Sequence, residues 1–449
     1  MNWNRLEEKV LEEHYPEEKE LEKTRQKYRE IAGYIESEFG RETHFAGSSA
    51  RGTCMKGDRD IDIFVLFPED TDKKELEDRG LEIGKKTFEE FDGEYEIEFA
   101  EHPYTRGKIN GHEVEIVPCY DVAPEKIKSS VDRTPHHSRW VKQELDEEQK
   151  KEVVLLKVFL RAAGIYGSSL KVRGFSGYLC EILVSEYGSF EELIWGVNDW
   201  NGKEVIDPEN HHENGLPNEL EEKFSEDNLV VIDPVDPERN VAAALSRENY
   251  ARFIYQAWRL RQEPGMDFFS PEEPDYTEFD LKQEIEERSD FLVLRFENVD
   301  EVDDIVYPQM RKTLRRLEQI LEKNDFRVFN SGFHVGDETR IYFELERELP
   351  GIKEKKGPKV FHGEDHLAQF TGKYDNVFVR DDRVYAKTER EFTDAKKLVQ
   401  DFLKGDLKEK GIPGHVAEKL EDYSFVDPLE GDERWLNHLA KKLHVNQDG

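Results

Sequence analysis

Apolar residues recur at helical spacing across residues 17–39, and Gly40 follows the last of them. This pattern predicts an amphipathic helix that ends at the glycine. After a loop of small residues, residues 61–67 (IDIFVLF) form a short apolar run that Pro68 closes. Such a run between turn-forming residues predicts a buried strand.

Two further segments alternate between apolar and polar residues, over 95–104 and 112–122. Alternation of this kind predicts strands, and residues 106–112 (RGKINGH) are expected to form the hairpin between them. With the helix and the buried strand that precede them, these strands predict an α/β fold for the first 125 residues.

From about residue 140 to residue 260 the apolar residues follow the helical period. The segments EVVLLKVFLRAAGIYG and GFSGYLCEILVSEYG each carry an apolar stripe, and residues 240–262 predict a long third helix. Residues 263–280 are rich in proline and acidic residues, which indicates a domain boundary.

Beyond this boundary the pattern mixes strands and helices. Residues 291–299 predict a strand, residues 308–326 a basic amphipathic helix, and residues 327–350 two strands around Gly336–Asp337. The remainder is expected to end in mixed helices, one of them over 391–403. We therefore predict a multidomain protein with an α/β part, a helical part and an α+β C-terminal part.

The composition changes this picture, because the chain is unusually acidic. Its 449 residues include 65 Lys and Arg against 101 Asp and Glu, a formal net charge of −36, and 11% are aromatic. The aromatic content argues against disorder. The charge excludes a generic basic coat for nucleic acid and repels an anionic membrane. Salt adaptation, in which negative charge keeps a protein soluble in concentrated KCl, would explain the acidity.

No segment predicts export or a membrane span. No apolar run approaches the roughly 18 residues that a membrane span needs. The first residues are acidic and polar, where a secretory signal needs a basic and then an apolar stretch. Cys54, Cys119 and Cys180 lie far apart without a CxxC motif, so neither a disulfide framework nor a cysteine-rich zinc site is expected. We expect a soluble cytoplasmic protein with no membrane partner.

The strongest chemical pattern is a glycine–serine loop, residues 47–53 (GSSARGT), followed by Asp60 and Asp62 at the start of the predicted strand. Residues i and i+2 of a strand point to the same face, so both carboxylates would enter one site. Two close carboxylates favour a divalent cation, and the loop offers backbone N–H groups, a hydroxyl and Arg51 to phosphate. A phosphate cradle beside such a pair is typical of two-metal phosphoryl or nucleotidyl transfer. A solvated strand end would also explain the two aspartates.

A third carboxylate is expected in a site of this kind. Glu113 and Glu115 fall on one face of the strand over 112–122, and either could serve. A strand with a polar outer face would give the same pattern at both positions.

Several motifs occur in an order that resembles the archaeal (class I) CCA-adding enzymes, which are tRNA nucleotidyltransferases. They include GSSARGT…GDRDIDIFVLFP, EIVPCYDV, VDRTPHHSRWV, LLKVFLRAAGIYG, KVRGFSGYLCE and DPVDPERNVAAALS. The resemblance implies a polymerase-β-like nucleotidyltransferase head over residues 1–140, which is catalytic. It implies a helical neck over 141–265 that recognises the base, and an α+β body and tail over 266–449 that binds tRNA.

The resemblance also implies roles for individual residues. Asp60, Asp62 and Glu115 are expected to be catalytic and to bind Mg²⁺. The expected nucleotide-binding residues are Ser48 and Arg51 on the triphosphate, His137, Lys157 and Tyr166 from the neck, and Arg239 in reading the base.

Two positions depart from the family pattern. The third acid is usually Asp in this family, and Glu115 is longer by one methylene group. The histidine is doubled as His136–His137, and we choose His137 because the small hydroxyl residue Ser138 follows it. From pattern alone, Lys157 could instead be a lysine that snorkels at the rim of a helix.

Similar structural explanations exist for two other neck residues. Tyr166 could be a core aromatic residue, and Arg239 could form an ion pair at a helix end.

The implied reaction is template-independent addition of C, C and A to the 3′ end of tRNA from CTP and ATP, with release of pyrophosphate. Mg²⁺ is the expected cofactor, tRNA is expected to be bound through its acceptor arm and 3′ end, and a homodimer is left open. One alternative is a poly(A)-type or oligoadenylate nucleotidyltransferase of the same superfamily. The other is a non-catalytic RNA-binding relative.

Basic residues are concentrated in two places, which suits an RNA ligand on an acidic protein. The first is the stretch that contains Lys126, Lys128, Arg133, Arg139 and Lys142. The second is the helix over 308–326, whose paired basic residues lie four apart and would form one stripe: Arg311, Lys312, Arg315 and Arg316. An ordinary solvated helix face with glutamate partners would give the same spacing.

Overall fold

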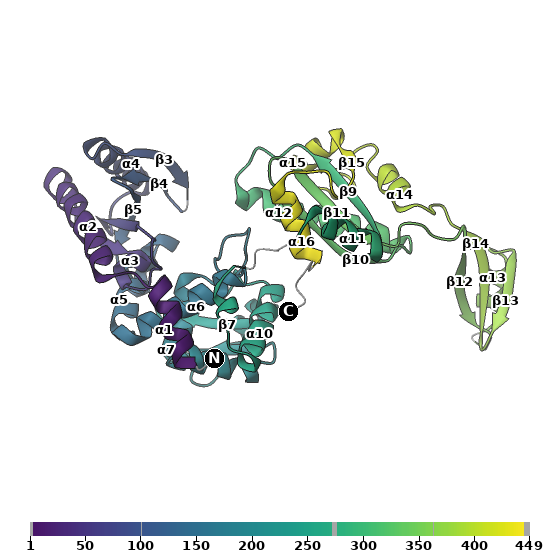
Figure 1. The fold of residues 1–449 in the computed structure, drawn as a ribbon, viewed down its shortest axis with the longest axis horizontal. Helices are drawn as coiled ribbons and strands as arrows, with labels where there is room; N and C mark the ends of the chain where they lie inside the picture. The colour runs from purple at the N-terminus through teal and green to yellow at the C-terminus, as the bar shows by residue number, and fades with distance from the viewer. Residues whose placement is uncertain (1–2, 100, 272–275, 362, 444–449) are drawn as a thin grey trace. The chain divides into compact units, whose positions relative to one another are not determined.

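The computed structural model describes residues 3–99, 101–271, 276–361 and 363–443 (Figure 1). The chain divides into two compact units, Met1–Glu272 and Glu273–Gly449. Each unit has hydrophobic cores of its own. The predicted class, a multidomain protein with α/β, helical and α+β parts, is confirmed. The finer division at residues 140 and 265 stays a prediction.

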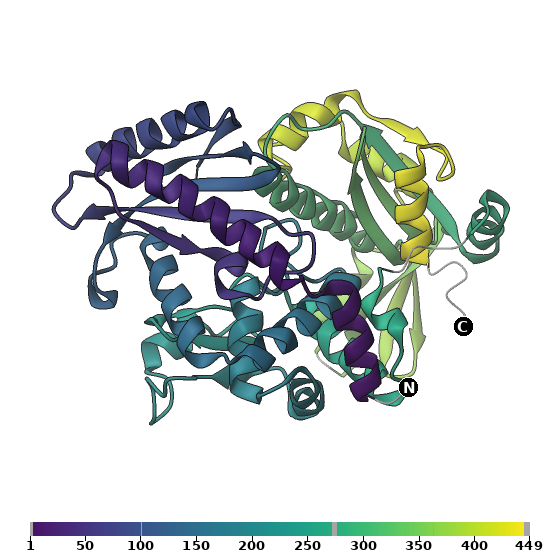
Figure 2. The same ribbon diagram turned by 60° about the vertical axis from the view of Figure 1, so that its left-hand side comes forward.

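The first unit contains a five-stranded sheet of order β1-β2-β5-β4-β3. Strands β2 and β5 are parallel, and the other neighbours are antiparallel. Helices α2 (Glu18–Phe39) and α4 (Lys73–Glu90) pack on the sheet, and Figure 2 shows α2 lying along it. The strands are β1 (Thr43–Ala46), β2 (Asp60–Pro68), β3 (Glu94–Phe99), β4 (Pro103–Ile109) and β5 (His112–Asp121).

In this part of the chain, two predicted elements are confirmed, and the predicted hairpin and one predicted strand are wrong in extent. Helix α2 ends at Phe39 before a left-handed Gly40, and the apolar run predicted over 61–67 is β2. The predicted hairpin is too long, because its turn consists only of Asn110 and Gly111, at φ of 50° and 80°. Such a pair of left-handed residues matches the twist of the flanking strands.

The strand predicted over 95–104 is also too long. It is divided into β3, which ends at Phe99, and β4, which begins at Pro103 and runs antiparallel to β3. Both segments alternate in the same way, so periodicity alone did not reveal the reversal between them.

The rest of the first unit is mainly helical and surrounds a core that includes Leu156, Phe159 and Leu183. Helix α1 (Trp3–His14) packs against α6 in the same core. The other helices are α5 (Arg133–Glu144), α6 (Glu147–Ala162), α7 (Gly177–Tyr187), α8 (Phe190–Gly196), α9 (Asn218–Lys223) and α10 (Arg247–Gln262).

The helix predicted over 240–262 begins later, at Arg247, because the Ser246 side chain caps it by accepting from the backbone N–H of Asn249. Residues 241–246 form turns and an irregular segment that follow a small sheet of order β6-β7-β8, which the helical pattern did not predict. Its strands are β6 (Glu204–Ile206), β7 (Leu229–Asp233) and β8 (Asp236–Asn240). They are only three to five residues long, too short for a periodic signal.

The second unit is built on a four-stranded antiparallel sheet of order β10-β11-β9-β15. Helix α12 packs on it through Met310, Leu317 and Leu321. The strands are β9 (Asp290–Phe296), β10 (Val328–Val335), β11 (Thr339–Leu345) and β15 (Ser424–Val426). The helices are α11 (Glu278–Arg288), α12 (Asp303–Lys323), α14 (Ala395–Phe402), α15 (Gly414–Lys419) and α16 (Glu433–Leu443).

The strands predicted around Gly336–Asp337 and over 291–299 are confirmed, and the helix predicted over 308–326 begins five residues earlier, at Asp303. The remainder ends in helices as expected, with α14 inside the segment predicted over 391–403, but the sequence pattern did not predict every element in it. It contains a second sheet of order β12-β14-β13 with one helix beside it. These elements are β12 (Ile352–Lys359), α13 (Glu364–Thr371), β13 (Asn376–Arg380) and β14 (Arg383–Glu389).

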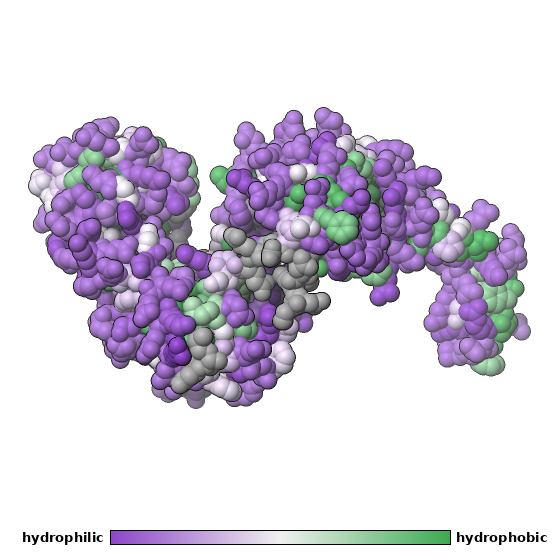
Figure 3. All heavy atoms as spheres, viewed as in Figure 1, coloured by the Kyte–Doolittle hydropathy of each residue, from purple (hydrophilic) through white to green (hydrophobic). Residues whose placement is uncertain are grey.

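Hydrophilic residues cover most of the face seen in Figure 3, as a charge of −36 requires. Across the part of the chain that the structure describes, no helix combines the length and the apolar character needed to cross a membrane.

Candidate active site

The glycine–serine loop is in direct contact with Asp62, the second member of the predicted acidic pair. Strand β1 ends at Ala46, and Gly47 begins the short helix α3 (Gly47–Arg51) with φ of 73°. A Cβ atom at Gly47 would lie 1.7 Å from Oδ2 of Asp62, so only glycine fits here. The loop backbone therefore lies against the Asp62 carboxylate.

The parallel pairing of β2 with β5 brings the predicted acids together. Asp62 is the register partner of Glu115, and Asp60 is the partner of Glu113. All four side chains project from the same face of the sheet, because they alternate along their strands. The register thus puts Glu115, rather than Glu113, beside the half-buried Asp62.

The environment of these acids disfavours negative charge. Burial and then the charge of Asp60 raise the pKa of Asp62 to about 6. Burial and then the charge of Asp62 raise the pKa of Glu115 to about 7, and burial raises the pKa of Asp60. Carboxylates that repel one another in this way are stabilised by a cation between them.

Two basic residues of β4 place positive charge beside these acids. Nε of Arg106 lies 3.4 Å from Oε1 of Glu115, and Nζ of Lys108 lies 3.2 Å from Oε1 of Glu113. Within the described residues, no three acidic, histidine or cysteine side chains are grouped as a complete metal site. The acids fit a divalent cation in chemistry and in register, with Glu115 paired to Arg106 in this conformation.

The Arg51 side chain lies in a buried polar cluster with Glu181 and Ser138. Its Nε donates to Oε1 of Glu181 at 2.8 Å, and Nη1 donates to Oγ of Ser138 at 3.3 Å. Glu181, from α7, is 0% exposed. The positive charge of Arg51 still reaches the acids, because it lowers the pKa of Asp62 against the effect of burial.

Lys157 belongs to the same cluster. It is 1% exposed, and its Nζ donates to the carbonyl oxygen of Thr53 at 2.7 Å. Burial lowers the pKa of its ammonium group. The side chain therefore does not snorkel to the rim of α6, and it ties α6 to the loop that carries Arg51.

Tyr166 lies next to Lys157 over the start of α7. A Cβ atom at Gly177 would lie 3.3 Å from Oη of Tyr166 and 3.5 Å from Nζ of Lys157. Tyr166 is half-buried, and burial raises its pKa. Two of the predicted neck residues are therefore side by side.

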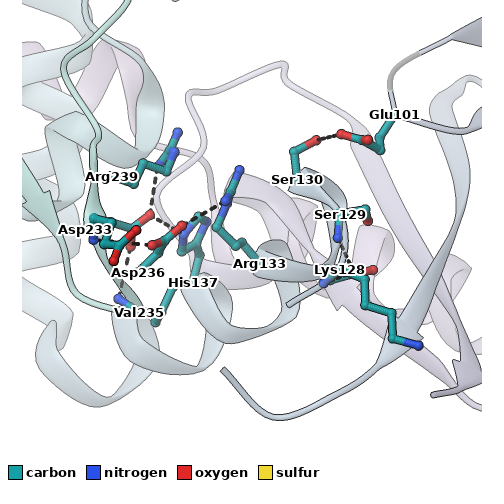
Figure 4. A network of polar contacts seen from close by, with 12 residues as sticks. Glu101, Lys128, Ser129, Ser130, Arg133, His137, Asp233, Val235, Asp236 and Arg239 are labelled. Carbon is teal, nitrogen blue, oxygen red and sulfur yellow. Dashed lines mark hydrogen bonds and ion pairs between the residues drawn. The ribbon is translucent and has the colours of Figure 1, made fainter. Parts of the chain in front are cut away.

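Two further predicted nucleotide-binding residues, His137 and Arg239, meet at one carboxylate (Figure 4). Oδ2 of Asp233 accepts from Nε2 of His137 at 2.9 Å and from Nη1 of Arg239 at 2.7 Å. Its Oδ1 accepts from the backbone N–H of Val235 at 3.0 Å and from Oη of Tyr178 at 3.3 Å. The ring of His137 stacks on Tyr178 with centroids 4.0 Å apart.

These contacts also govern charge. Burial alone would raise the pKa of Asp233, but the hydrogen bond and charge of His137, followed by Val235 and Arg239, bring it below its usual value. Burial lowers the pKa of His137 in spite of Asp233. A charged Asp233 therefore faces an imidazole that donates from Nε2.

The two adjacent histidines have different surroundings. Nε2 of His136 lies 2.9 Å from the carbonyl oxygen of Val122, at the end of the five-stranded sheet. His137 instead faces β7 and Asp233. The geometry thus separates a histidine that joins two backbone segments from one that lies in the polar site.

Sequence reasoning missed three residues of this site: Tyr178, Glu181 and Asp233. All three lie inside the quoted motifs RGFSGYLCE and DPVDPERN, which supplied a family resemblance but no chemical role. A buried acid surrounded by donors is visible only after folding, since its partners come from distant segments.

Most residues of the first basic stretch are engaged by acids or polar groups of the protein. Lys126 pairs with Glu69 at 3.2 Å, and Arg133 pairs with Asp236 at 2.9 Å. On α12, Lys312 and Arg315 are exposed, whereas Arg316 packs on Phe402 and donates to the carbonyl oxygen of Lys410. The predicted stripe is therefore uneven in exposure.

Three family models match consecutive parts of the chain. They describe a nucleotidyltransferase domain over residues 28–137, the second domain of tRNA nucleotidyltransferase over 151–270, and the C-terminal domain of CCA-adding enzyme over 288–426. Their matches together run from α2 in the first unit to β15 in the second.

Curated relatives match the chain at nearly full length. A CCA-adding enzyme of Methanocaldococcus jannaschii is 40% identical over 454 residues, covering 98% of this chain and 97% of that protein. One of Archaeoglobus fulgidus is 38% identical and covers 97% of both chains. One of Haloarcula marismortui is 39% identical, covering 84% of this chain and 82% of that protein.

Proposed function

This chain belongs to the family of CCA-adding enzymes, and we propose that it adds C, C and A to the 3′ end of tRNA from CTP and ATP by nucleotidyl transfer. The observation that carries the proposal is the pairing of Asp62 with Glu115 across β2 and β5, under the loop that begins at Gly47. That arrangement joins acids to a loop suited to phosphate, as transfer to a triphosphate requires.

We propose Mg²⁺ as the divalent ion, with Asp60, Asp62 and Glu115 as its ligands. Their raised pKa values and shared face support this choice. Mg²⁺ bound there would lower the pKa of the tRNA 3′-hydroxyl and offset negative charge on the triphosphate. To bind Mg²⁺, Glu115 would have to break its ion pair with Arg106. The Arg106 guanidinium could then pair with a phosphate group.

The loop residues are proposed to hold the triphosphate. Ser48 is half-buried on the loop that touches Asp62, and its hydroxyl can donate to a phosphate oxygen. Arg51 and Lys157 donate to protein acceptors, so we propose that they fix the loop and supply positive charge to it.

The residues His137, Tyr166 and Arg239 are proposed to contact the incoming nucleotide, with Arg239 reading the base. Arg239 suits this role because its side chain is 35% exposed and a guanidinium has five N–H donors. We further propose that residues 1–140 catalyse, that 141–265 recognise the base and that 266–449 hold the acceptor arm, in the cytoplasm.

The test is incorporation of labelled CTP or ATP into tRNA that lacks its CCA end. We expect two C residues and then one A, and no extension by Asp62→Ala at saturating Mg²⁺. Phosphate contacts elsewhere should keep tRNA binding by that variant within a few-fold of wild type. A product of ATP alone on varied RNA would favour the poly(A)-type alternative, and tRNA binding without extension would favour a non-catalytic relative.

A further inference from the structure

Asp233 connects two side chains that are far apart in the sequence. His137 lies 96 residues before it and Arg239 six residues after it, and both donate to the same oxygen, Oδ2. Neither side chain can shift without breaking its bond to Asp233 or moving the other. The carboxylate therefore couples their positions.

The carboxylate itself is held rigidly. Asp233 is 0% exposed at the end of β7, and four donors reach its two oxygens. A buried carboxylate keeps its charge at low cost only when its lone pairs are used in this way. Strand β7 lies between β6 and β8 in its small sheet, so backbone pairing on both sides holds the segment that ends at Asp233.

Arg239 remains accessible to a ligand, whereas only 13% of the His137 side chain is exposed. The Arg239 side chain is 35% exposed and uses Nη1 on Asp233, so its guanidinium has further N–H donors. His137 is stacked on Tyr178, which fixes the plane of its ring. A planar donor set of this kind can recognise a base edge or a phosphate.

We propose that Asp233 is a positioning residue for nucleotide selection, which fixes Arg239 and His137 in one arrangement around the incoming CTP or ATP. This inference rests on the proposed function. Asp233 acts through its two partners and does not itself contact the nucleotide.

Asparagine at this position keeps the shape but not the acceptors. Its amide NH₂ would face donors where the second carboxylate oxygen now accepts, so at least one of the four bonds is lost. Loss of one hydrogen bond to a charged partner corresponds to roughly a 10- to 100-fold change. We therefore expect Asp233→Asn to lower kcat/KM for CTP and ATP by about that factor.

The decisive readout is selectivity. Asp233→Asn should lower the preference for CTP over UTP at least tenfold, measured at a temperature at which circular dichroism shows that the variant is folded, because loss of a buried hydrogen bond also lowers Tm. The matched control is Asp236→Asn, three residues along, whose carboxylate holds Arg133 and touches neither His137 nor Arg239. The control should keep the selectivity of wild type.

Two measurements do not depend on turnover. Titration calorimetry with CTP should show weaker binding to Asp233→Asn than to wild type and Asp236→Asn. It separates the two claims: if wild type binds CTP but never extends tRNA, the proposed function fails, and the CTP titrations still decide the role of Asp233.

The second is a double-mutant cycle on the two partners. His137→Ala and Arg239→Ala should weaken CTP binding non-additively, because one carboxylate couples them. This cycle still applies if Asp233→Asn does not fold. Wild-type CTP affinity and CTP-over-UTP preference in a folded Asp233→Asn, or additive losses in the cycle, would overturn the proposal.

Discussion

At the scale of single residues, Gly47 sets how closely the glycine–serine loop approaches Asp62. A methyl group there would overlap the Asp62 carboxylate, and the backbone is left-handed. Gly47→Ala should therefore displace either the loop or Asp62 and lower nucleotide addition at least 100-fold, because small misplacements of reacting groups have large effects on rate. Single-turnover incorporation of CTP measures this loss.

Gly40 provides the control for backbone strain. It has a similar φ of 61° but nothing within 4 Å of an added Cβ atom. Gly40→Ala should cost about 1 kcal/mol of stability and leave the rate unchanged. Equal losses of rate in both variants would show that strain, rather than contact with Asp62, is responsible.

Glu115 and Glu113 are distinguished by register. Because Glu115 is beside Asp62, Glu115→Gln should abolish CTP and ATP incorporation together. Glu113, which pairs with Lys108 on the outer side of the site, should tolerate Gln with little change. Parallel incorporation assays decide between them, and the reverse pattern would mean that Glu113 is the third ligand.

Single residues also show how far the sequence could lead. The shared face of Asp60 and Asp62 could be predicted, because it follows from their spacing of two residues on one strand. Asp233 and Glu181 were not, because each is defined by partners from distant segments, 96 residues away for His137 and 130 for Arg51. Periodicity carries no information about such contacts.

At the scale of elements, long periodic segments were predicted well and boundaries less so. Helix α2 and strand β2 have strong patterns, and both agree with prediction. The start of α10 at Arg247 depended on a cap, and the reversal between β3 and β4 depended on tertiary pairing. Neither the cap nor the pairing changes the spacing of apolar residues in the sequence.

Helix α1 carries a half-buried carboxyl group, Glu7, whose ionisation is expected to make the stability pH-dependent. Leu6 and Val10 pack in the core, while burial and then the charges of Glu152 and Glu191 raise the pKa of Glu7 to about 7. In the unfolded chain this carboxyl ionises at a lower pH. The folded state is therefore penalised as pH rises from about 4.5 to 7, and the penalty is complete above 7.

Glu7→Gln removes this penalty. We expect its Tm to exceed that of wild type by roughly 2 °C at pH 8 and to equal it at pH 4.5. Thermal unfolding at both pH values measures the difference, and Glu8→Gln on the exposed side of α1 is the control. A gain of the same size at pH 4.5 would rule out ionisation of Glu7 as its cause.

At the scale of the whole molecule, the charge of −36 conflicts with binding a polyanion. Many basic side chains are already paired with acids at the surface, such as Arg25 with Glu18 and Lys86 with Glu82. Exposed pairs of this kind contribute little to stability and are screened by salt. In dilute buffer, repulsion between the enzyme and tRNA should therefore limit binding.

Salt should relieve that repulsion. At molar KCl the Debye length is about 3 Å, so repulsion within the acidic surface and between enzyme and tRNA is screened. Counterion release weakens tRNA binding as salt rises, and the two effects oppose each other. We expect CCA addition to rise from low salt to an optimum above about 0.5 M KCl, with a parallel gain in Tm. Assays and melts across a KCl series measure both. A steady decline in activity from about 0.05 M KCl, with no gain in Tm, would mean that salt adaptation does not explain the acidity.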